Sequence, residues 1–442
     1  MGSENDATEA SSKQTAAPSA TETCPMSKVR KNISDYSLLD TGVQDQPFEF
    51  YQLLQQECPV YRMPETNFYI VSRYDDARRV ARDTTTFLNQ IPARQGLAGE
   101  RDAIYQSVLR ERGWPNVPTL QRCDGEQHAR HRKLVERVFT PARVREMTPR
   151  LEQLAHQIID RFIDRGECEF VSEFALMLPG MFISEQLGLD ADDVGMLKRW
   201  GDAIVAMRSR LLSEEEVRAT AEIELECQHH LAQVFEARRT TPANDILSGL
   251  VHLHGEGEEP LSMGELQGLG AQLIAAGFET TMGAISHGMM FLQLFPDQMA
   301  KLRADRSLMK NFVEEVLRYD APVHGILRLA TDDVEIAGTT IPKGSIVMPR
   351  FGAANRDANK YPDPDIFDIT RANAASHVSF GFGPHFCIGA VLAKQEMITG
   401  FSAVLDRMDD IRLAGPIPRP SHRPDFWLRP LKELRLIFRR PS

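Results

Sequence analysis

The stretch "FGFGPHFCIG", residues Phe380 to Gly389, surrounds a single cysteine with glycines and phenylalanines. Glycine loses more conformational entropy on folding than any other residue, and it is kept where the chain turns tightly or passes close to another group. The glycines on both sides of Cys387 therefore predict a tight loop with a large group lying against it.

This loop and the residues after it fill one longer pattern, F-x-x-G-x-[H/R]-x-C-x-G-x-x-L-A, with Phe380, Gly383, His385, Cys387, Gly389, Leu392 and Ala393. The pattern resembles the haem-binding loop of the cytochromes P450, the haem-thiolate monooxygenases. The resemblance implies that Cys387 is the metal ligand of a haem b (iron protoporphyrin IX). It also implies that Phe380 covers the sulfur, and that Gly381 and Gly389 let the backbone lie close to the macrocycle. A thiolate on haem iron donates electron density that favours O–O cleavage.

Two other interpretations of Cys387 stay open at this point. A free cysteine in a glycine-rich turn can be a buried structural residue. A cysteine protease would need a base and a group that orients it, and no motif in the sequence indicates either.

A second motif interrupts the most apolar helix of the sequence. Ser262 to Phe295 is apolar on nearly every face, which predicts a long, buried central helix. Within it, "AAGFETT" places the small residues Ala276 and Gly277 before Glu279 and Thr280. The segment is similar to the oxygen-activation site of the family, which implies that Ala276 lies at the cofactor, Thr280 supports dioxygen and Glu279 relays protons. The alternative is a threonine bonded back to its own helix and an acid that reaches solvent.

Charged residues elsewhere match further family positions. Glu315 and Arg318 lie on one helix face, and the resemblance adds Arg371 to this pair as a structural cluster. The resemblance also implies that the haem carboxylates are bound by His128, Arg132, Arg328 and His385. One departure affects the loop before His128, where the usual D-P-P-x-H reads "DGEQH".

The remaining sequence favours one large, mainly α domain with small β-sheets, and the resemblance implies the cytochrome P450 fold. Helices are expected over residues 143–166 and 213–239, and hairpins over 61–72 and 334–349. Residues 1–28 read as a disordered tail and 29–442 as a single haem-thiolate domain. The six scattered cysteines and the missing apolar signal or membrane segment favour a soluble, cytoplasmic protein without a membrane anchor. The net charge of −11 argues against nucleic acid as a partner.

The resemblance implies a monooxygenase (hydroxylase) that uses O2 on a hydrophobic small molecule of terpenoid, steroid or aromatic type. Electrons would come from a separate ferredoxin-type donor with an NAD(P)H-dependent reductase, since the sequence holds no flavin or iron–sulfur segment. Lys133, Arg137 and Arg356 are candidates for the docking surface, and His324 and Arg94 for a polar contact to substrate. A peroxide-driven peroxygenase and a non-catalytic haem sensor are the alternatives, and the Glu279–Thr280 pair argues against both.

Overall fold

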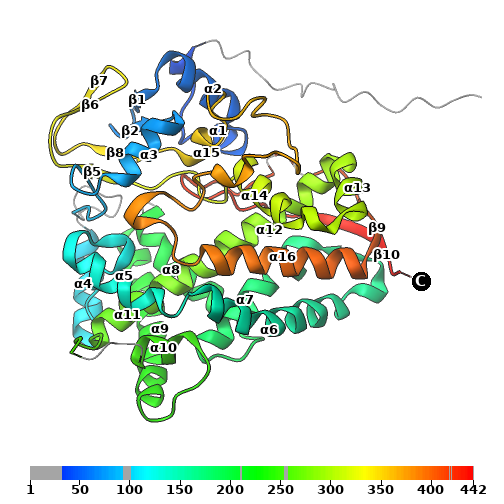
Figure 1. The fold of residues 1–442 in the computed structure, drawn as a ribbon. Coiled ribbons are helices and arrows are strands. Elements are labelled where there is room, and N and C mark those ends of the chain that lie inside the picture. Colours follow the sequence, from blue (N-terminus) through cyan, green and yellow to red (C-terminus); the bar gives the residue numbers. More distant parts are fainter. Residues whose placement is uncertain are drawn as a thin grey trace, which may run out of the picture.

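The computed structural model describes residues 32–92, 101–209, 212–252, 257–417, 419 and 421–441, so the expected tail over residues 1–28 lies outside the described residues. The described chain is mainly helical, with small sheets at its edges (Figure 1). The helices are α1 (Thr41–Asp45), α2 (Phe48–Glu57), α3 (Tyr74–Arg82), α4 (Arg101–Arg112), α5 (Gly125–Glu136), α6 (Pro141–Asp160), α7 (Met177–Gln186), α8 (Val194–Ser209), α9 (Glu214–Thr240), α10 (Ile246–His252), α11 (Met263–Gly277), α12 (Glu279–Leu294), α13 (Pro296–Ala304), α14 (Met309–Tyr319), α15 (Phe351–Ala354) and α16 (Ala390–Arg407).

The strands form short sheets that join distant parts of the chain. The largest has the order β1-β2-β8-β5-β3, with β1 (Val60–Arg62), β2 (Tyr69–Val71), β8 (Ile346–Pro349), β5 (Arg328–Ala330) and β3 (Phe87–Leu88). A second has the order β4-β10-β9, with β4 (Glu167–Glu169), β10 (Arg435–Arg439) and β9 (Asp409–Leu413). The hairpin of β6 (Val334–Ile336) and β7 (Thr339–Ile341) stands alone.

Both expected hairpins form, with one difference in their extent. β1 pairs antiparallel with β2, and β6 pairs antiparallel with β7. Residues 346–349 leave the second hairpin and pair in parallel with β2 instead. After this pairing the chain continues from β8 into α15, which precedes the cysteine loop in the sequence. The alternation of apolar and polar residues within the segment could not predict a partner as distant as β2.

Two long helices begin close to where the hydrophobic periodicity placed them, but α6 ends at Asp160, before the expected end at Gly166, which instead closes a separate 3-10 turn over Ile163–Arg165. In α9, the Ser213 hydroxyl accepts a hydrogen bond from the Glu216 amide at 3.2 Å, so the expected cap is present. In α6, Thr140 caps the first turn and Pro141 occupies the first helical position, where it needs no amide partner. The apolar faces of α6 and α16 pack against each other.

The expected central helix forms as two consecutive segments. α11 ends at Gly277, α12 begins at Glu279, and Phe278 between them has φ −116° and ψ −41°. A Cβ on Gly277 would lie 3.1 Å from Ile183 Cδ1 of α7, so this glycine serves helix packing, while Ala276 is exposed on another side. α12 packs against α7, α14 and α16, and its residues Thr281 to Leu292 are buried. No helix among the described residues is long and apolar enough to cross a bilayer.

Candidate functional site

The cysteine loop is closed by its own backbone. The Cys387 amide donates to the Phe380 carbonyl at 2.8 Å. Gly381 has φ +74° and Gly383 has φ +78°, a region that residues with a side chain rarely adopt. A Cβ on Gly383 would lie 2.8 Å from Cα of Arg82, so part of what lies against this loop is the end of α3 rather than a ligand.

The Cys387 thiol lies at the positive end of a helix. Cys387 is a free cysteine, exposed on one side and enclosed by protein on the others. Burial raises the pKa of its thiol, while hydrogen bonds from the amides of Gly389 and Ala390 and the charge of Arg132 act in the opposite direction. These amides belong to the start of α16, whose N-terminal end carries a partial positive charge. The arrangement supports a thiolate, and a metal cation bound to the sulfur would complete its deprotonation.

The residues expected to bind the haem carboxylates come together from three separate segments. The rings of His128 on α5 and His385 in the cysteine loop lie 4.0 Å apart. An Arg132 guanidinium nitrogen donates to the Phe386 carbonyl, next to the cysteine. Burial lowers the pKa of His128 to about 4, with the charges of His385 and Arg132 acting in the same direction. These residues therefore lie close together, and their role in binding the haem carboxylates stays a prediction.

Arg328 on β5 completes this cluster and has an unsatisfied donor. Its side chain is buried, and its Nη1 donates to the Leu327 carbonyl at 2.9 Å, but its Nε has no hydrogen-bond partner in the described structure. Burial lowers the pKa of Arg328 to about 10, and the nearby Asp124 carboxylate opposes this shift. A buried guanidinium donor without a partner is costly unless an anion accepts from it.

Asp124 is a member of the site that the sequence analysis did not nominate. It accepts from the Asn89 amide at 2.7 Å and bonds His385 Nε2 at 3.0 Å. Burial alone would raise its pKa, but the hydrogen bonds from His385 and Asn89 outweigh it and lower the pKa to about 2. Asp124 therefore holds the His385 ring in place, although the prolines usual in this motif are missing from "DGEQH". The position of Asp124 at the start of that motif was the sequence feature that could have identified it.

These residues fit a flat cofactor with carboxylate groups. Arg328 offers an unused donor to an anion, and the Cβ position of Gly389 has nothing nearer than Cys387 Sγ at 4.0 Å, so the backbone there leaves space for a planar group. The role of Phe380 as a cover for the sulfur stays a prediction, although its ring lies 6.2 Å from that of Phe386.

The charge cluster expected behind the loop is present, and each charge is satisfied. Arg318 donates from Nε and Nη2 to the two oxygens of Glu315 at 2.7 and 2.8 Å, and both residues are fully buried. Arg371 joins them at 3.2 Å. Arg318 also donates to the Asn355 carbonyl at 3.2 Å.

Asn355 connects this charge cluster to the residues just before the cysteine loop. Its side chain accepts from the Val378 amide at 2.8 Å and donates to the Ser379 hydroxyl at 2.7 Å. Ser379 in turn donates to the Leu317 carbonyl on α14 at 2.6 Å. The cluster thereby holds the start of the loop against α14, which is the structural role that the sequence analysis expected.

Glu279 and Thr280 lie where the central helix is interrupted. The Thr280 hydroxyl donates to the Ala276 carbonyl at 2.8 Å, so the back-bonded geometry considered from the sequence is present. Glu279 Oε1 lies 3.5 Å from Lys198 Nζ, and Lys198 also pairs with Asp202 at 2.7 Å. Burial raises the pKa of Glu279; Lys198 opposes the shift and the hydrogen bond to Asp202 adds to it.

The sequence analysis did not identify a buried carboxyl group next to this segment. Glu396 on α16 is 1% exposed, interacts with Thr281, and has one oxygen, Oε1, without a partner in the described structure. Burial raises its pKa to about 8. A lone glutamate in an amphipathic helix looks like a solvated residue in the sequence, so no local signal distinguishes it.

Two expectations about polar residues near the site are wrong, and a third falls outside the described residues. His324 cannot face a substrate, because it is buried between Tyr51 Oη at 2.7 Å and Asp320 Oδ1 at 2.9 Å. Arg356 is also buried, and it bonds Asp365 at 2.8 Å. Arg94 lies outside the described residues.

The other two candidates for a basic docking surface are not free charges. The Lys133 ammonium and the Arg137 guanidinium both pair with Glu258, Arg137 at 3.0 Å. Of the three expected residues, Arg356 is buried, and the positive charges of Lys133 and Arg137 are offset by Glu258, which weakens the case for this surface.

Comparison with known proteins agrees with this geometry. The family model described as Cytochrome P450 matches residues 202–432, just over half of the chain. The 6-deoxyerythronolide B hydroxylase of Saccharopolyspora erythraea is 35% identical and the match covers 83% of this chain and 89% of the hydroxylase. The cytochrome P450 monooxygenase PikC of Streptomyces venezuelae is 33% identical over 91% of this chain and 95% of PikC.

A solved structure extends the agreement to the fold. The structure of a cytochrome P450 from Chondromyces apiculatus superimposes with a TM-score of 0.78 at 32% identity, covering 92% of this chain and 98% of that one. Membership of one family therefore accounts for the cysteine loop, for the cluster of His128, Arg132, Arg328 and His385, and for the helical fold. The chain belongs to the cytochrome P450 family and is a haem-dependent P450 monooxygenase.

Proposed function

We propose that this P450 inserts one oxygen atom from O2 into a large apolar molecule of polyketide type, with iron protoporphyrin IX (haem b) as cofactor. The observation that carries the oxygen-dependent reaction is the buried Glu279 beside Thr280 at the interruption of the central helix. A peroxide-driven enzyme or a haem sensor needs no proton relay, so this pair favours turnover with O2.

The cofactor would be held by residues of three kinds. Cys387 would ligate the iron, and Arg328, His128, Arg132 and His385 would bind the carboxylates. When bound, the haem supplies a thiolate-ligated iron for dioxygen activation.

Proton delivery is the task of this chain's own residues. Asp202, whose side chain is 46% exposed, is in contact with solvent, whereas Glu279 is 16% exposed. Because burial and Asp202 raise the pKa of Glu279, its proton affinity moves toward neutral pH, where a relay carboxyl works best. Thr280 donates its hydroxyl hydrogen to the Ala276 carbonyl, and its oxygen lone pairs remain able to accept a hydrogen bond from the group that receives the proton.

The variant Thr280→Ala tests this role. It should keep haem and substrate binding but divert reducing equivalents to hydrogen peroxide, lowering product formed per NADH by at least about tenfold. Thr148→Ala is the matched control, because the Thr148 hydroxyl bonds the carbonyl of Val144 on α6 in the same back-bonded way at 2.9 Å. Unchanged coupling in Thr280→Ala would refute the relay.

The substrate proposal rests on the relatives. One is named for its hydroxylation of 6-deoxyerythronolide B, a macrocyclic polyketide lactone. Titration with this lactone should shift the haem spin state at lower concentration than titration with a steroid, a terpenoid or a small aromatic compound. A tighter response to any of these three would replace the polyketide class.

The proposed electron donor is a separate acidic ferredoxin with an NAD(P)H-dependent reductase. Because Lys133 and Arg137 are paired with Glu258, the stronger support comes from α3, whose end lies against the cysteine loop at Gly383. Arg78 and Arg82 stand 4.0 and 5.6 Å from the Phe382 ring centre, and Arg82 is exposed. Arg82→Glu should therefore raise the ferredoxin concentration needed for half-maximal reduction, and an unchanged value would move the docking surface elsewhere.

A further inference from the structure

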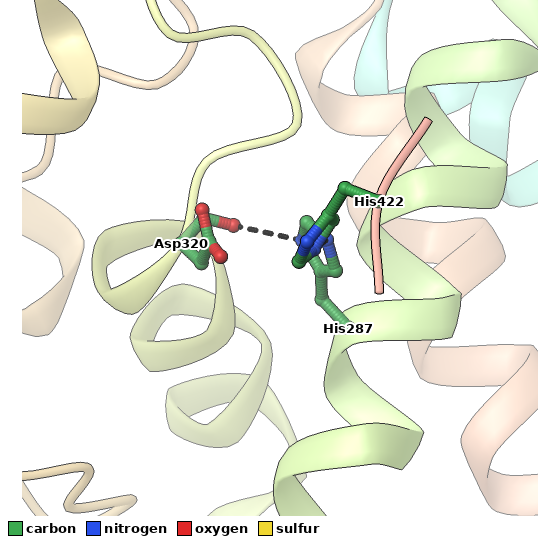
Figure 2. Close-up of side chains that lie close together, drawn as sticks. All are labelled: His287, Asp320 and His422. Carbon is green, nitrogen blue, oxygen red and sulfur yellow. Dashed lines mark hydrogen bonds between the residues drawn. The ribbon is translucent and has the colours of Figure 1, made fainter. Parts of the chain in front are cut away.

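A buried cluster away from the cysteine loop brings together two histidines and an aspartate. His287 lies on α12, Asp320 directly follows α14, and His422 lies in the C-terminal segment (Figure 2). Their exposed fractions are 0%, 3% and 4%. One nitrogen or oxygen atom from each lies within 4.8 Å of the other two. The haem site described above uses none of these residues.

Hydrogen bonding fixes the protonated nitrogen of each ring. His422 Nδ1 lies 3.0 Å from Asp45 Oδ1, a carboxylate oxygen that can only accept. His287 Nδ1 lies 3.2 Å from the backbone carbonyl oxygen of Asp320, which also can only accept. The Ser421 hydroxyl lies 3.0 Å from His422 Nδ1 and also 3.0 Å from Asp45 Oδ1, to which it donates. With that hydrogen on Asp45, the arrangement that satisfies these contacts puts the ring hydrogen on Nδ1 of each histidine, and each Nε2 of a neutral ring presents a lone pair.

These two lone pairs face each other. His287 Nε2 and His422 Nε2 are 3.1 Å apart. Two buried acceptors at this separation repel each other unless a cation lies between them.

The separation suits two ligands of one zinc ion. Nitrogens bound to tetrahedral zinc at about 2.0–2.1 Å lie about 3.3 Å apart. A histidine that ligates a metal usually donates its other ring N–H to a carboxylate or a backbone carbonyl, and that is the role of Asp45 for His422 and of the Asp320 carbonyl for His287. Asp320 would add its carboxylate as a third ligand.

The neighbouring charges allow a cation here. Arg429 donates to Asp320 from Nε at 2.9 Å and from Nη2 at 3.0 Å, and His324 Nε2 bonds the same carboxylate at 2.9 Å. Oδ1 accepts from both Arg429 Nε and His324 Nε2, whereas Oδ2 accepts from Arg429 Nη2 and keeps a lone pair that a metal ion could use. Arg429 Nη2 lies 3.4 Å from Nδ1 and 3.3 Å from Nε2 of His422. Because Arg429 Nη2 is nearly equidistant from the two ring nitrogens, it lies over the face of the His422 ring. In the plane of the ring, an atom at these distances would collide with the carbon between the two nitrogens.

We propose that His287, His422 and Asp320 form a structural zinc site. The ion would tie the central helix to the end of α14 and to the C-terminal segment. Asp45 balances the added charge and orients His422. The site is independent of the cysteine loop, so its failure would leave the monooxygenase assignment unchanged.

Zinc analysis of the haem-loaded protein tests the site. After expression with zinc chloride and dialysis against a chelator, the wild type should retain about one zinc per chain, measured by mass spectrometry of the elements. His287→Gln and His422→Gln should each lose it. His156→Gln is the control, because His156 is exposed on α6, and it should retain zinc.

Crystallography of the wild type gives a second readout that does not depend on the variants folding. Data collected on both sides of the zinc absorption edge should place an anomalous peak between the two Nε2 atoms. Absence of zinc from the wild type, or zinc retained in both variants, would overturn the proposal and leave a shared proton as the bridge between the rings.

Discussion

Replacing Glu315 by Gln should destabilise the protein more than any exposed charge substitution, because it leaves a buried arginine without its counter-ion. The Glu315 carboxylate accepts two bonds from Arg318, one from Arg371 at 3.2 Å and one from the Asp368 amide at 3.0 Å. A glutamine keeps one acceptor oxygen but turns an NH2 group toward two guanidinium groups.

The expected magnitude follows from the burial of the pair. Both Glu315 and Arg318 are 0% exposed, and removing one partner of a buried pair typically costs about 3–5 kcal/mol. Backbone carbonyls at Asn355, Pro364 and Ile366 still accept from Arg318 and place the loss toward the lower end of that range. A loss of about 3 kcal/mol is a large part of an ordinary folding free energy.

Urea unfolding of the haem-loaded protein, followed by circular dichroism, measures this loss. Glu236→Gln is a matched control, because Glu236 and Arg239 have the same three-residue spacing but are 62% and 39% exposed. The control should change the unfolding free energy by less than about 1 kcal/mol. A loss below about 1 kcal/mol in Glu315→Gln would refute the reasoning that this cluster holds the cysteine loop in place.

Three further predictions concern other parts of the site. Gly383→Ala should cost more stability than Gly338→Ala, because both glycines have positive φ but only the Gly383 side chain would meet backbone, 2.8 Å from Arg82 Cα; equal losses in urea unfolding would contradict the close approach to α3. Arg328→Met should speed haem transfer to apomyoglobin by about tenfold, because it removes a charged donor from the carboxylate cluster; an unchanged transfer rate would exclude this residue from haem binding. Burial raises the pKa of Glu396 from 4.5 to about 8, so the unfolded chain releases this proton at lower pH than the folded chain, and stability should fall as pH rises between these values. Glu396→Gln should flatten that slope of the unfolding free energy against pH, and a slope as steep as the wild type's would show that Glu396 is not protonated in the folded state.

The sequence predicted the site best where a residue's role depends on a local pattern. The loop around Cys387 needs glycines at fixed positions, and the Glu315–Arg318 spacing places both side chains on one helix face, so both motifs were visible in the chain. The resemblance to the family then placed His128 and Arg328 in one cluster, which the structure brings together.

The errors have a common physical origin in contacts between distant segments. Whether Lys133 is a free charge depends on Glu258, and whether His324 faces a ligand depends on Tyr51; neither partner is near in sequence. The break at Phe278 falls inside the "AAGFETT" segment that the sequence pointed to, but the packing of Gly277 against Ile183 of α7 depends on a residue far away in the sequence. For the same reason the contact between His287 and His422 has no sequence signal.

The visible absorption spectrum of the purified protein, reduced with dithionite and exposed to carbon monoxide, tests the central claim most directly. The account predicts a strongly red-shifted Soret band for the wild type, the signature of thiolate-ligated haem. Cys387→Ser should lose that band, while Cys227→Ser, which changes a buried cysteine on α9, should keep it. A wild-type protein that stays haem-free when supplied with iron and haem precursor, or a Cys387→Ser variant that keeps the red-shifted band, would contradict the assignment of Cys387 as the iron ligand.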